Sequence, residues 1–299
     1  MTVFAVGPVR VRVPATSANL GPGFDTLGLA VDLHDELVGE VIDSGLHVEV
    51  VGAGAGEVPL DERHLVVRAM RLAFDAMDVR PEGLRLSCTN RIPHARGLGS
   101  SSAAIVGGMA LARALVVDGA ERLDDDALLQ LAATEEGHPD NVAPAIFGGF
   151  VVAGQAGERF FSVSAAVRPG LRTVVMVPSQ PLSTEVARSL LPEVVPHADA
   201  AANAGRAALL VTAIGGHPEH LLNATADLLH QDYREPGMPD SLALMRELRA
   251  DGHAAVISGA GPTVLVLTAA DDVSSLMARC PDGWDAHELA IAERGVHLA

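Results

Sequence analysis

The 299-residue sequence predicts an α+β protein in two halves that join near residue 165. Some segments alternate apolar and polar residues, as strands do, and others repeat apolar residues every three or four positions, as helices do. In the second half, several helical segments stand together between one strand and a closing pair of strands, which is typical of an α+β arrangement. No internal repeat or low-complexity linker interrupts either half.

The first half contains both kinds of element. Four segments have the pattern of a strand: 9–13, 27–41 (with a bend near Asp35), 46–51 and 84–89. Three have the spacing of a helix: 61–77, a segment from residue 100 to about 117, and 125–136. Asp61 is expected to cap the first helix. The three aspartates at 124–126 are expected to cap the third helix and compensate its dipole, which is commoner than a metal site.

The first half ends with two further strands, expected at 147–152 and 160–163. The second half begins and ends with strands, expected at 171–177, 254–258 and 263–267. Helices are expected at 184–190, 200–214, 219–230 and 240–250.

A loop with two glycines and three serines, within residues 92–104, is the most informative segment. A flexible turn that opens a helix offers unpaired N–H groups and the positive end of the helix dipole, which bind phosphate. The serine hydroxyls add donors and possible Mg²⁺ ligands. The helix keeps Gly107 and Gly108 in its interior at a cost of about 1 kcal/mol each, so close packing is expected. The alternative is an ordinary loop with a helix cap.

The chain contains no lysine, which excludes several classes of site. A Walker A loop and a protein-kinase site each need a lysine at the phosphates, and Schiff-base chemistry needs a lysine amine. The Gly-x-Ser-x-Gly elbow of serine hydrolases is absent around the three serines. The glycines at 52–56 depart from the dinucleotide-binding spacing and precede no helix pattern, so a hairpin or loop is expected there.

The charge and the cysteines limit the partners. A net charge of −17 disfavours nucleic acid, whose backbone it would repel. No apolar run reaches the roughly 18 residues of a membrane span, and the first residues lack the basic region of a signal peptide. Cys88 and Cys280 suit neither a disulfide framework nor a zinc site, so a cytoplasmic protein is expected.

Two further segments are rich in glycine and small polar residues. Residues 13–25 place Thr16, Ser17, Asn19 and Asp25 in one short stretch after a strand. Residues 257–263 join two strands through glycines, which allow the main chain to approach a ligand closely. Each segment by itself could be a plain turn.

The end of the helix at 125–136 is unusually polar. It gathers Glu135, Glu136, His138, Asp140 and Asn141 within seven positions. No second His or Cys has the spacing of a transition-metal site. Mg²⁺ needs only one or two protein oxygens beside substrate phosphates, so the segment fits a site for Mg²⁺ and a reacting hydroxyl.

Together these segments resemble the GHMP kinase superfamily and, within it, the homoserine kinase family. The loop at 93–104 matches the superfamily. Three runs match the homoserine kinase pattern in order: Pro-Ala-Thr-Ser-Ala-Asn-Leu-Gly-Pro-Gly-Phe-Asp ending at Asp25, His-Pro-Asp-Asn-Val-Ala-Pro from His138, and Ser-Gly-Ala-Gly-Pro-Thr from Ser258. The resemblance spans residues 9–267. It implies a two-lobed fold, with a ribosomal protein S5 domain 2-like, ATP-binding lobe at 1–165 and a ferredoxin-like lobe at 166–299.

The resemblance also implies roles for individual residues. The residues implied to hold ATP are Pro93, His94, Ala95, Arg96, Gly97, Leu98, Gly99, Ser100, Ser101, Ser102 and Ala103. Those implied to bind homoserine are Asn19, Asp25, His138, Asn141, Thr184, Arg188, Arg234 and Gly261. Asp25 would face the ammonium group, and the arginines suit the carboxylate because a guanidinium can bind both of its oxygens.

The implied reaction transfers the γ-phosphoryl group of ATP to the side-chain hydroxyl of L-homoserine, a step of threonine biosynthesis. Mg²⁺ would be held by Ser101 and Glu136, with Glu135 as the alternative ligand. Asn141 would lie close to the accepting hydroxyl. Asp140 is a candidate base, and direct passage of the proton to the phosphate is the alternative. His64 stands where the family usually has Asn near the adenine.

The resemblance further implies a homodimer, with no nucleic acid or membrane as a partner. Two other functions stay open. A GHMP kinase for mevalonate, shikimate or a sugar would share residues 93–104 but would not need Asp25 to meet an ammonium group. A non-catalytic nucleotide-binding relative is disfavoured by the presence of Ser101, Glu136 and Asn141.

Overall fold

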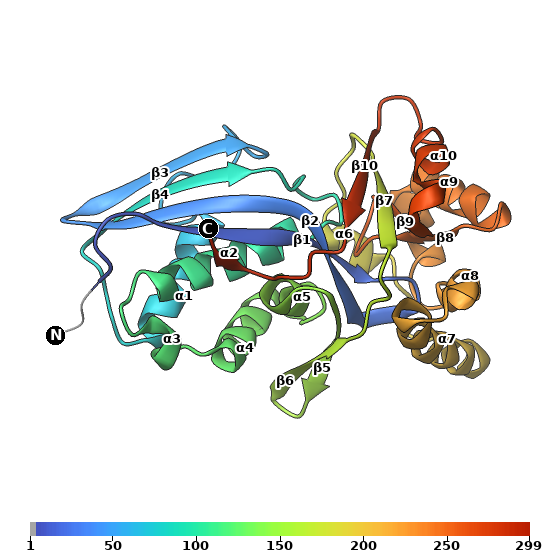
Figure 1. Cartoon of the computed structure of the whole chain (residues 1–299), viewed down its shortest axis with the longest axis horizontal. Helices are drawn as coiled ribbons and strands as arrows, with labels where there is room; N and C mark the ends of the chain where they lie inside the picture. Colours follow the sequence, from blue (N-terminus) through green and yellow to red (C-terminus); the bar gives the residue numbers. More distant parts are fainter. Residues whose placement is uncertain (1–3) are drawn as a thin grey trace.

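The computed structural model describes residues 4–299 and contains two sheets (Figure 1). The larger sheet has seven strands, which follow from the period-two alternation of apolar residues. The order along this first sheet is β11-β1-β2-β4-β3, and β5 and β6 continue from β2. Its strands are β1 (Val9–Asn19), β2 (Gly23–Ile42), β3 (Gly45–Gly52), β4 (Gly83–Asn90), β5 (Phe150–Ala156), β6 (Arg159–Ala165) and β11 (His297–Leu298). Neighbouring strands are antiparallel except β3 and β4, which run parallel.

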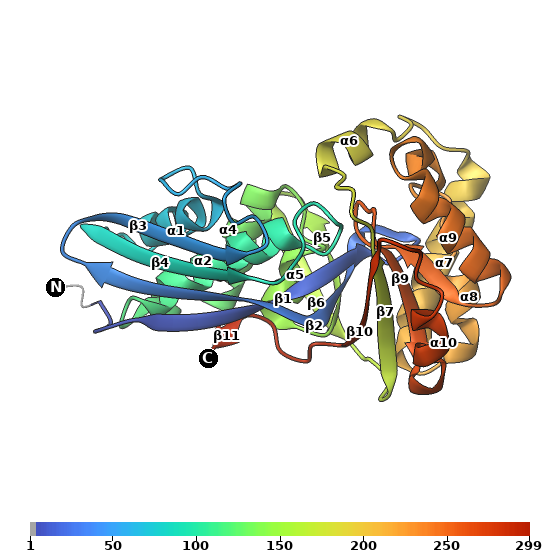
Figure 2. The ribbon, with the colours of Figure 1, turned by 90° about the horizontal axis from the view of Figure 1, so that it is seen from above.

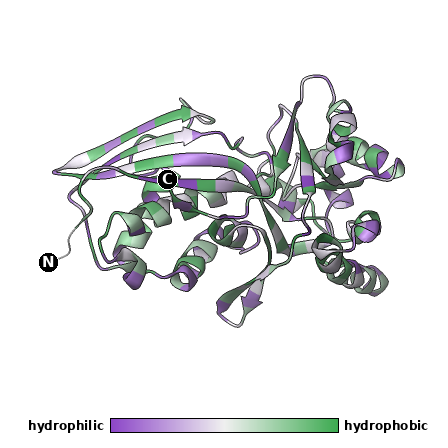
Figure 3. Ribbon diagram, in the orientation of Figure 1, coloured by the Kyte–Doolittle hydropathy of each residue, from purple (hydrophilic) through white to green (hydrophobic). Residues whose placement is uncertain are grey.

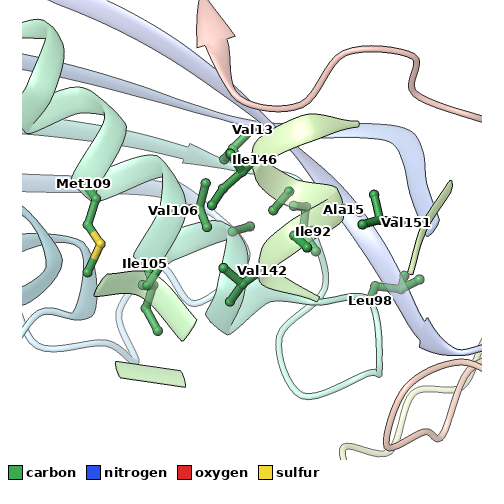
Figure 4. Packing of buried hydrophobic residues seen from close by; sticks show 14 of the residues in the cluster. Val13, Ala15, Ile92, Leu98, Ile105, Val106, Met109, Val142, Ile146 and Val151 are labelled. Atoms are coloured by element: carbon green, nitrogen blue, oxygen red, sulfur yellow. The ribbon is translucent and has the colours of Figure 1, made fainter. Parts of the chain in front are cut away.

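Five helices lie on one face of the first sheet (Figure 1). They are α1 (Leu65–Ala76), α2 (Ser100–Ala114), α3 (Gly119–Arg122), α4 (Asp125–Glu136) and α5 (Val142–Phe147). Helix α2 packs closely, as its glycines predict: a Cβ at Gly107 would lie 2.7 Å from Cδ1 of Leu37, and one at Gly108 would lie 2.7 Å from the carbonyl oxygen of Val66. The core beneath the sheet includes Val13, Val106, Val142 and Ile146 (Figure 4).

The second sheet has four antiparallel strands in the order β10-β7-β9-β8. These are β7 (Leu171–Val177), β8 (Ala254–Ile257), β9 (Val264–Ala269) and β10 (Asp285–Ala290). The helices of this half are α6 (Thr184–Ser189), α7 (His197–Gly215), α8 (Leu221–Ala224), α9 (Pro239–Ala250) and α10 (Val273–Met277), with 3-10 turns η1 (Pro218–His220), η2 (Asp232–Gly237) and η3 (Ala270–Asp272). Figure 2 shows α6 on the side of the second lobe that faces the first.

Strand β7 contributes side chains to a core on each of its faces, which explains the apolar run at 174–177. Leu171, Val175 and Val177 belong to the core shared with the first lobe, whereas Val174 and Met176 belong to a second core under α9. In Figure 3 the strands and helices carry green apolar stretches interrupted by purple polar ones. Among residues 4–299, no helix is both long and apolar enough to cross a membrane.

The predicted α+β class and most elements are confirmed. The strand expected from 147 begins at Phe150, because Phe147 ends α5, and four further local predictions are wrong. Strand β1 runs on to Asn19 instead of ending at residue 13, so the polar segment there is strand rather than turn. The helix expected from 61 begins at Leu65 with His64 as its N-cap residue, and Asp61 binds Arg63 instead. The helix expected at 219–230 stops after α8. The Asp227 carboxylate there accepts hydrogen bonds from three N–H groups of residues 229–231, which competes with a helical path.

The fourth error concerns the end of the chain. The strand over 263–267 is not the last, because β10 completes the second sheet and β11 follows it. Strand β11 pairs with β1, with Val11 opposite Leu298, so the chain returns to the first sheet.

Candidate active site

A cavity of about 260 Å³ lies where both lobes contribute loops. Its wall is formed by the end of β1, the start of β2, the glycine-rich loop, the segment between α4 and α5, the start of α6, and the turn between β8 and β9. The predicted residues that line it are Asn19, Asp25, Ala95, Gly97, Gly99, Ser100, Ser101, Glu136, His138, Asp140, Asn141, Thr184, Arg188, Arg234 and Gly261.

The glycine-rich loop enters α2 without a side-chain cap. Gly99 is the N-cap residue with φ +69°, and Gly97 has φ +75°, which favours glycine at both positions. A Cβ on Gly97 would lie 2.2 Å from the carbonyl oxygen of Ser258, so the loop is packed tightly against the second lobe. The first N–H groups of α2 therefore remain available for an anion beside the cavity.

Glu136 joins the last turn of α4 to the start of α2. Its Oε2 accepts a hydrogen bond of 2.9 Å from Ser101 and its Oε1 one of 2.8 Å from Ser102. The neighbouring Glu135 binds Arg68 on α1 instead and does not line the cavity. Glu136 and Ser101 thus present oxygen donors at the positive end of α2, a combination that suits Mg²⁺ bound to phosphates.

Asp25 is held by a left-handed turn. Asp25 (φ +53°) and Asn19 (φ +68°) both have a left-handed backbone, which among residues other than glycine is adopted mainly by asparagine and aspartate. The Asn19 carboxamide stabilises this turn, because its Oδ1 accepts from the N–H of Asp25 at 3.0 Å and its Nδ2 donates to Gly259 at 2.8 Å. The Asp25 carboxylate forms a two-point ion pair with Arg188 of α6.

Arg234 is a buried cation at the cavity wall, with 1% of its surface exposed. Its Nη1 donates to Gly259 and to Nδ1 of His230, both at 3.0 Å, and its Nε donates to Ala187 at 3.3 Å. Within residues 4–299 nothing accepts a hydrogen bond from Nη2. Burial, followed by repulsion from Arg188, lowers the pKa of Arg234 to about 10, so the group stays charged at neutral pH.

One aromatic ring lies close to both arginines. The guanidinium carbons of Arg188 and Arg234 lie 5.6 and 5.7 Å from the centre of the Phe24 ring, which itself stacks on His230. Cation–π attraction to one shared ring keeps both cations near the cavity despite their mutual repulsion.

The segment between α4 and α5 contributes His138, Asp140 and Asn141. His138 Nδ1 lies 2.7 Å from Oδ1 of Asp140, and Asp140 is almost fully buried. Burial acts to lower the pKa of His138, but the hydrogen bond and charge of Asp140, with help from Glu136, outweigh it and raise the pKa.

A second cavity of about 290 Å³ adjoins the first and shares Ser100 and Ser101 with it. Its wall is mainly apolar and includes His94, Ala103, Asp35, Asn90 and His64. His64 is buried, its Nδ1 has no hydrogen-bond partner among the described residues, and burial lowers its pKa. This cavity would accept a largely apolar group attached to phosphates at the loop.

The comparisons with known proteins agree with this geometry. Residues 64–149 match the family model of the GHMP kinases N terminal domain. Homoserine kinase from Streptomyces avermitilis is 53% identical over 99% of this chain and 97% of its own length. The chain belongs to the homoserine kinase family. Another homoserine kinase, from Clavibacter michiganensis, is 52% identical over 96% of this chain and 92% of its own.

Solved structures show the same fold as this homoserine kinase family member. Homoserine kinase from Cytophaga hutchinsonii superimposes with a TM-score of 0.84 at 23% identity, covering 99% of this chain and 100% of that one. Mevalonate diphosphate decarboxylase from Staphylococcus aureus gives 0.70 at 15% identity, covering 99% and 98%. Both likenesses bear on the fold, and they confirm the predicted two-lobed GHMP kinase architecture.

Four of the loop residues expected to hold ATP in this homoserine kinase family member line neither cavity: Pro93, Arg96, Leu98 and Ser102. Leu98 is buried in the core, and Ser102 binds Glu136. Arg96 donates to the carbonyl oxygens of Pro178 and Ser179, so its guanidinium ties the loop to the second lobe.

The sequence alone predicts no role for Thr16 or Asp35. Thr16 donates to Oδ1 of Asn141, and Asp35 lines the second cavity. Asp35 Oδ1 accepts from the N–H groups of Arg91 (2.6 Å) and Ile92 (2.9 Å), and burial raises the pKa of the carboxyl group. An aspartate inside an apolar strand pattern was the available signal for Asp35.

Proposed function

We infer that this member of the homoserine kinase family transfers the γ-phosphoryl group of ATP to the side-chain hydroxyl of L-homoserine. The products are O-phospho-L-homoserine and ADP, in threonine biosynthesis. The observation that carries this inference is the sequence identity over nearly the whole chain with homoserine kinases. The cavity supports it, because groups of opposite charge stand beside a loop suited to phosphate.

The acceptor would bind through its two charged groups. Asp25 would take the α-ammonium group, and the free Nη2 of Arg234 would donate to the α-carboxylate, with Arg188 as its second cation. His138, Thr184 and Gly261 would complete the pocket around the chain of the amino acid. Asn19 would act beside Asp25, since it holds the turn and keeps one N–H of its Nδ2 for a ligand.

The nucleotide would occupy both sides of the loop. The γ-phosphate would lie at Gly97, Gly99 and Ser100 in the first cavity, and the nucleoside would enter the second cavity past His94 and Ala103. Pro93, Ala95, Arg96, Leu98 and Ser102 would act by shaping the loop. His64 would then border the base, in the position where an Asn is usual in the family.

The residues that fit Mg²⁺ are Ser101 and Glu136, because their oxygens stand together where the phosphates would lie. When bound, the ion would neutralise charge on the phosphates and orient them. Glu135 is committed to Arg68 and is the weaker candidate.

The transfer itself asks mainly for alignment and charge neutralisation. The hydroxyl oxygen attacks phosphorus, the bond to the bridging oxygen of ADP breaks, and the hydroxyl proton passes to a phosphate oxygen. Asn141 would touch the reacting hydroxyl. Asp140 would orient His138 rather than take the proton, because its carboxylate is buried and already bound to that imidazole.

The family resemblance supports several broader proposals. These are a homodimer in the cytoplasm, no nucleic-acid or membrane partner, and a division of the chain into 1–165 and 166–299. The two sheets support that division, with the return of β11 to the first lobe as an addition to it.

The experiment is the release of ADP from ATP with L-homoserine, mevalonate or shikimate as acceptor, each with and without Mg²⁺. We expect release with L-homoserine and Mg²⁺ only. Release with mevalonate but not homoserine would refute the proposal. ATP binding without a phosphorylated product from any acceptor would favour a non-catalytic relative.

A further inference from the structure

The side chain of Asn141 does not cap α5, although Asn141 occupies the cap position. Asn141 is the N-cap residue of α5, and asparagine is among the preferred caps because it accepts hydrogen bonds from the first turn. Here the carboxamide makes no capping bond. Its Oδ1 lies instead 2.8 Å from Oγ1 of Thr16, 125 positions away in the chain. The side chain is therefore held by β1 rather than by its own helix.

Thr16 is enclosed on all sides. It is 0% exposed, and its N–H donates to the carbonyl oxygen of Leu98 in the glycine-rich loop at 3.1 Å. A Cβ placed on Gly99 would lie 2.0 Å from Oγ1 of Thr16 and 3.2 Å from Oδ1 of Asn141. The hydroxyl, the phosphate-binding loop and the carboxamide thus fit together with no space for another group.

This enclosure fixes which end of the carboxamide faces inward. A carboxamide can exchange its oxygen and nitrogen by a half turn, and the hydrogen bonds decide between the two orientations. The proton of a buried hydroxyl needs an acceptor, and within residues 4–299 Oδ1 of Asn141 is the acceptor that Thr16 reaches. The reversed carboxamide would leave that proton unpaired. Nδ2 is therefore the end left for the cavity.

We propose that Thr16 is a positioning residue for phosphoryl transfer, which it serves by holding Nδ2 of Asn141 toward the accepting hydroxyl. This inference rests on the proposed function. Nδ2 can only donate, so it would engage one lone pair of the hydroxyl oxygen. The second lone pair then faces phosphorus and the proton stays free to pass to a phosphate oxygen. A reversed carboxamide would present Oδ1, which would accept that proton and repel the phosphate oxygens.

The first test removes the hydroxyl while preserving the shape of the side chain. We expect Thr16→Val to lower kcat for homoserine-dependent ADP release by about 10- to 100-fold. The KM values for ATP and homoserine should change by less than about threefold, because the carboxamide is misaligned rather than lost. Thr16→Ser, which keeps the hydroxyl, should restore kcat to within about threefold of the unmodified protein.

A matched control separates positioning from a general loss of stability. Thr173 of β7 is also fully buried and donates one hydrogen bond of 2.8 Å, to Leu289. Thr173→Val removes a similar bond away from the cavity and should leave kcat unchanged.

A double-mutant cycle tests whether Thr16 acts through Asn141. Thr16→Val should slow the Asn141→Ala variant no further, because the group that Thr16 positions is already gone. Additive losses, or a Thr16→Val effect mainly on the KM for ATP, would overturn the inference and assign the hydroxyl to support of the loop.

If thermal unfolding shows that Thr16→Val does not fold, Thr16→Ala replaces it in the same cycle. Absence of homoserine-dependent ADP release from the unmodified protein would refute the proposed function instead.

Discussion

Arg188 and Asp25 neutralise each other inside the first cavity: Nη2 lies 2.7 Å from Oδ1 and Nη1 lies 3.1 Å from Oδ2. The pair joins α6 of the second lobe to the start of β2 in the first. The Asp25 hydrogen bond and charge raise the pKa of Arg188. A zwitterionic amino acid carries the complementary charge for each partner, so it can enter this pair without leaving either charge uncompensated.

Replacing Asp25 by Asn should therefore weaken homoserine binding specifically. The substitution removes the proposed partner of the ammonium group, and a lost charge-assisted hydrogen bond corresponds to a rise in KM of about tenfold or more. Steady-state kinetics with varied homoserine measures this, and the KM for ATP should stay unchanged. Asp32→Asn is the control, since Asp32 is an exposed aspartate of the same strand. An unchanged KM for homoserine in Asp25→Asn would contradict the assignment.

Glu136 and Glu135 give opposite predictions for Mg²⁺. Glu136→Gln removes the negative charge between Ser101 and Ser102, so half-maximal activity should need about tenfold more Mg²⁺. Glu135→Gln breaks only the exposed ion pair with Arg68 and should change the Mg²⁺ requirement by less than about twofold. Titration of activity with Mg²⁺ at saturating ATP decides between them. The reverse order would make Glu135 the ligand.

Asp140→Asn separates a base from a positioning carboxylate. Because the Asp140 hydrogen bond and charge raise the pKa of His138 against the effect of burial, the substitution should lower that pKa. A titration of the His138 ring followed by NMR measures the shift. We expect turnover at neutral pH to fall by less than about tenfold. A loss of about a thousandfold or more would instead identify Asp140 as the essential base.

The phosphate loop and the strands could be predicted from the sequence because their signals are local. Gly97 and Gly99 precede a run of small residues, and the spacing of apolar residues along β7 or α4 reports burial directly. The two lobes and the acceptor residues needed the family resemblance. Arg188 and Asp25 are 163 positions apart, and nothing in either local segment predicts their pairing.

The remaining features depend on tertiary contacts that no short pattern encodes. The sequence places Thr16 in a polar stretch. Its hydrogen bond to Asn141 forms only because β1 extends to Asn19 and the glycine-rich loop packs against Thr16. Likewise, the segment after α8 has helical spacing, but the hydrogen bonds from Asp227 hold it in another conformation. Arg234 gains its role because that conformation brings His230 and Gly259 to its guanidinium.

His64 predicts part of the pH dependence of stability. Burial first, and then the charge of His94, lower the pKa of His64 below the usual 6.5. At a pH between the folded and the unfolded pKa, the ring is therefore neutral in the folded protein and protonated in the unfolded chain. Well above pH 6.5 the ring is neutral in both states, and the group has no effect on stability. As the pH falls below 6.5 the unfolded state binds the extra proton, so stability falls by up to about 1.4 kcal/mol for each unit of pKa depression.

His64→Asn should therefore reduce the drop in Tm between pH 7 and pH 5. The substitution breaks no hydrogen bond of the described structure at Nδ1. His47→Asn, at an exposed position of β3, is the control and should leave the drop as it is. An equal drop in the unmodified protein and in His64→Asn would show that His64 does not contribute.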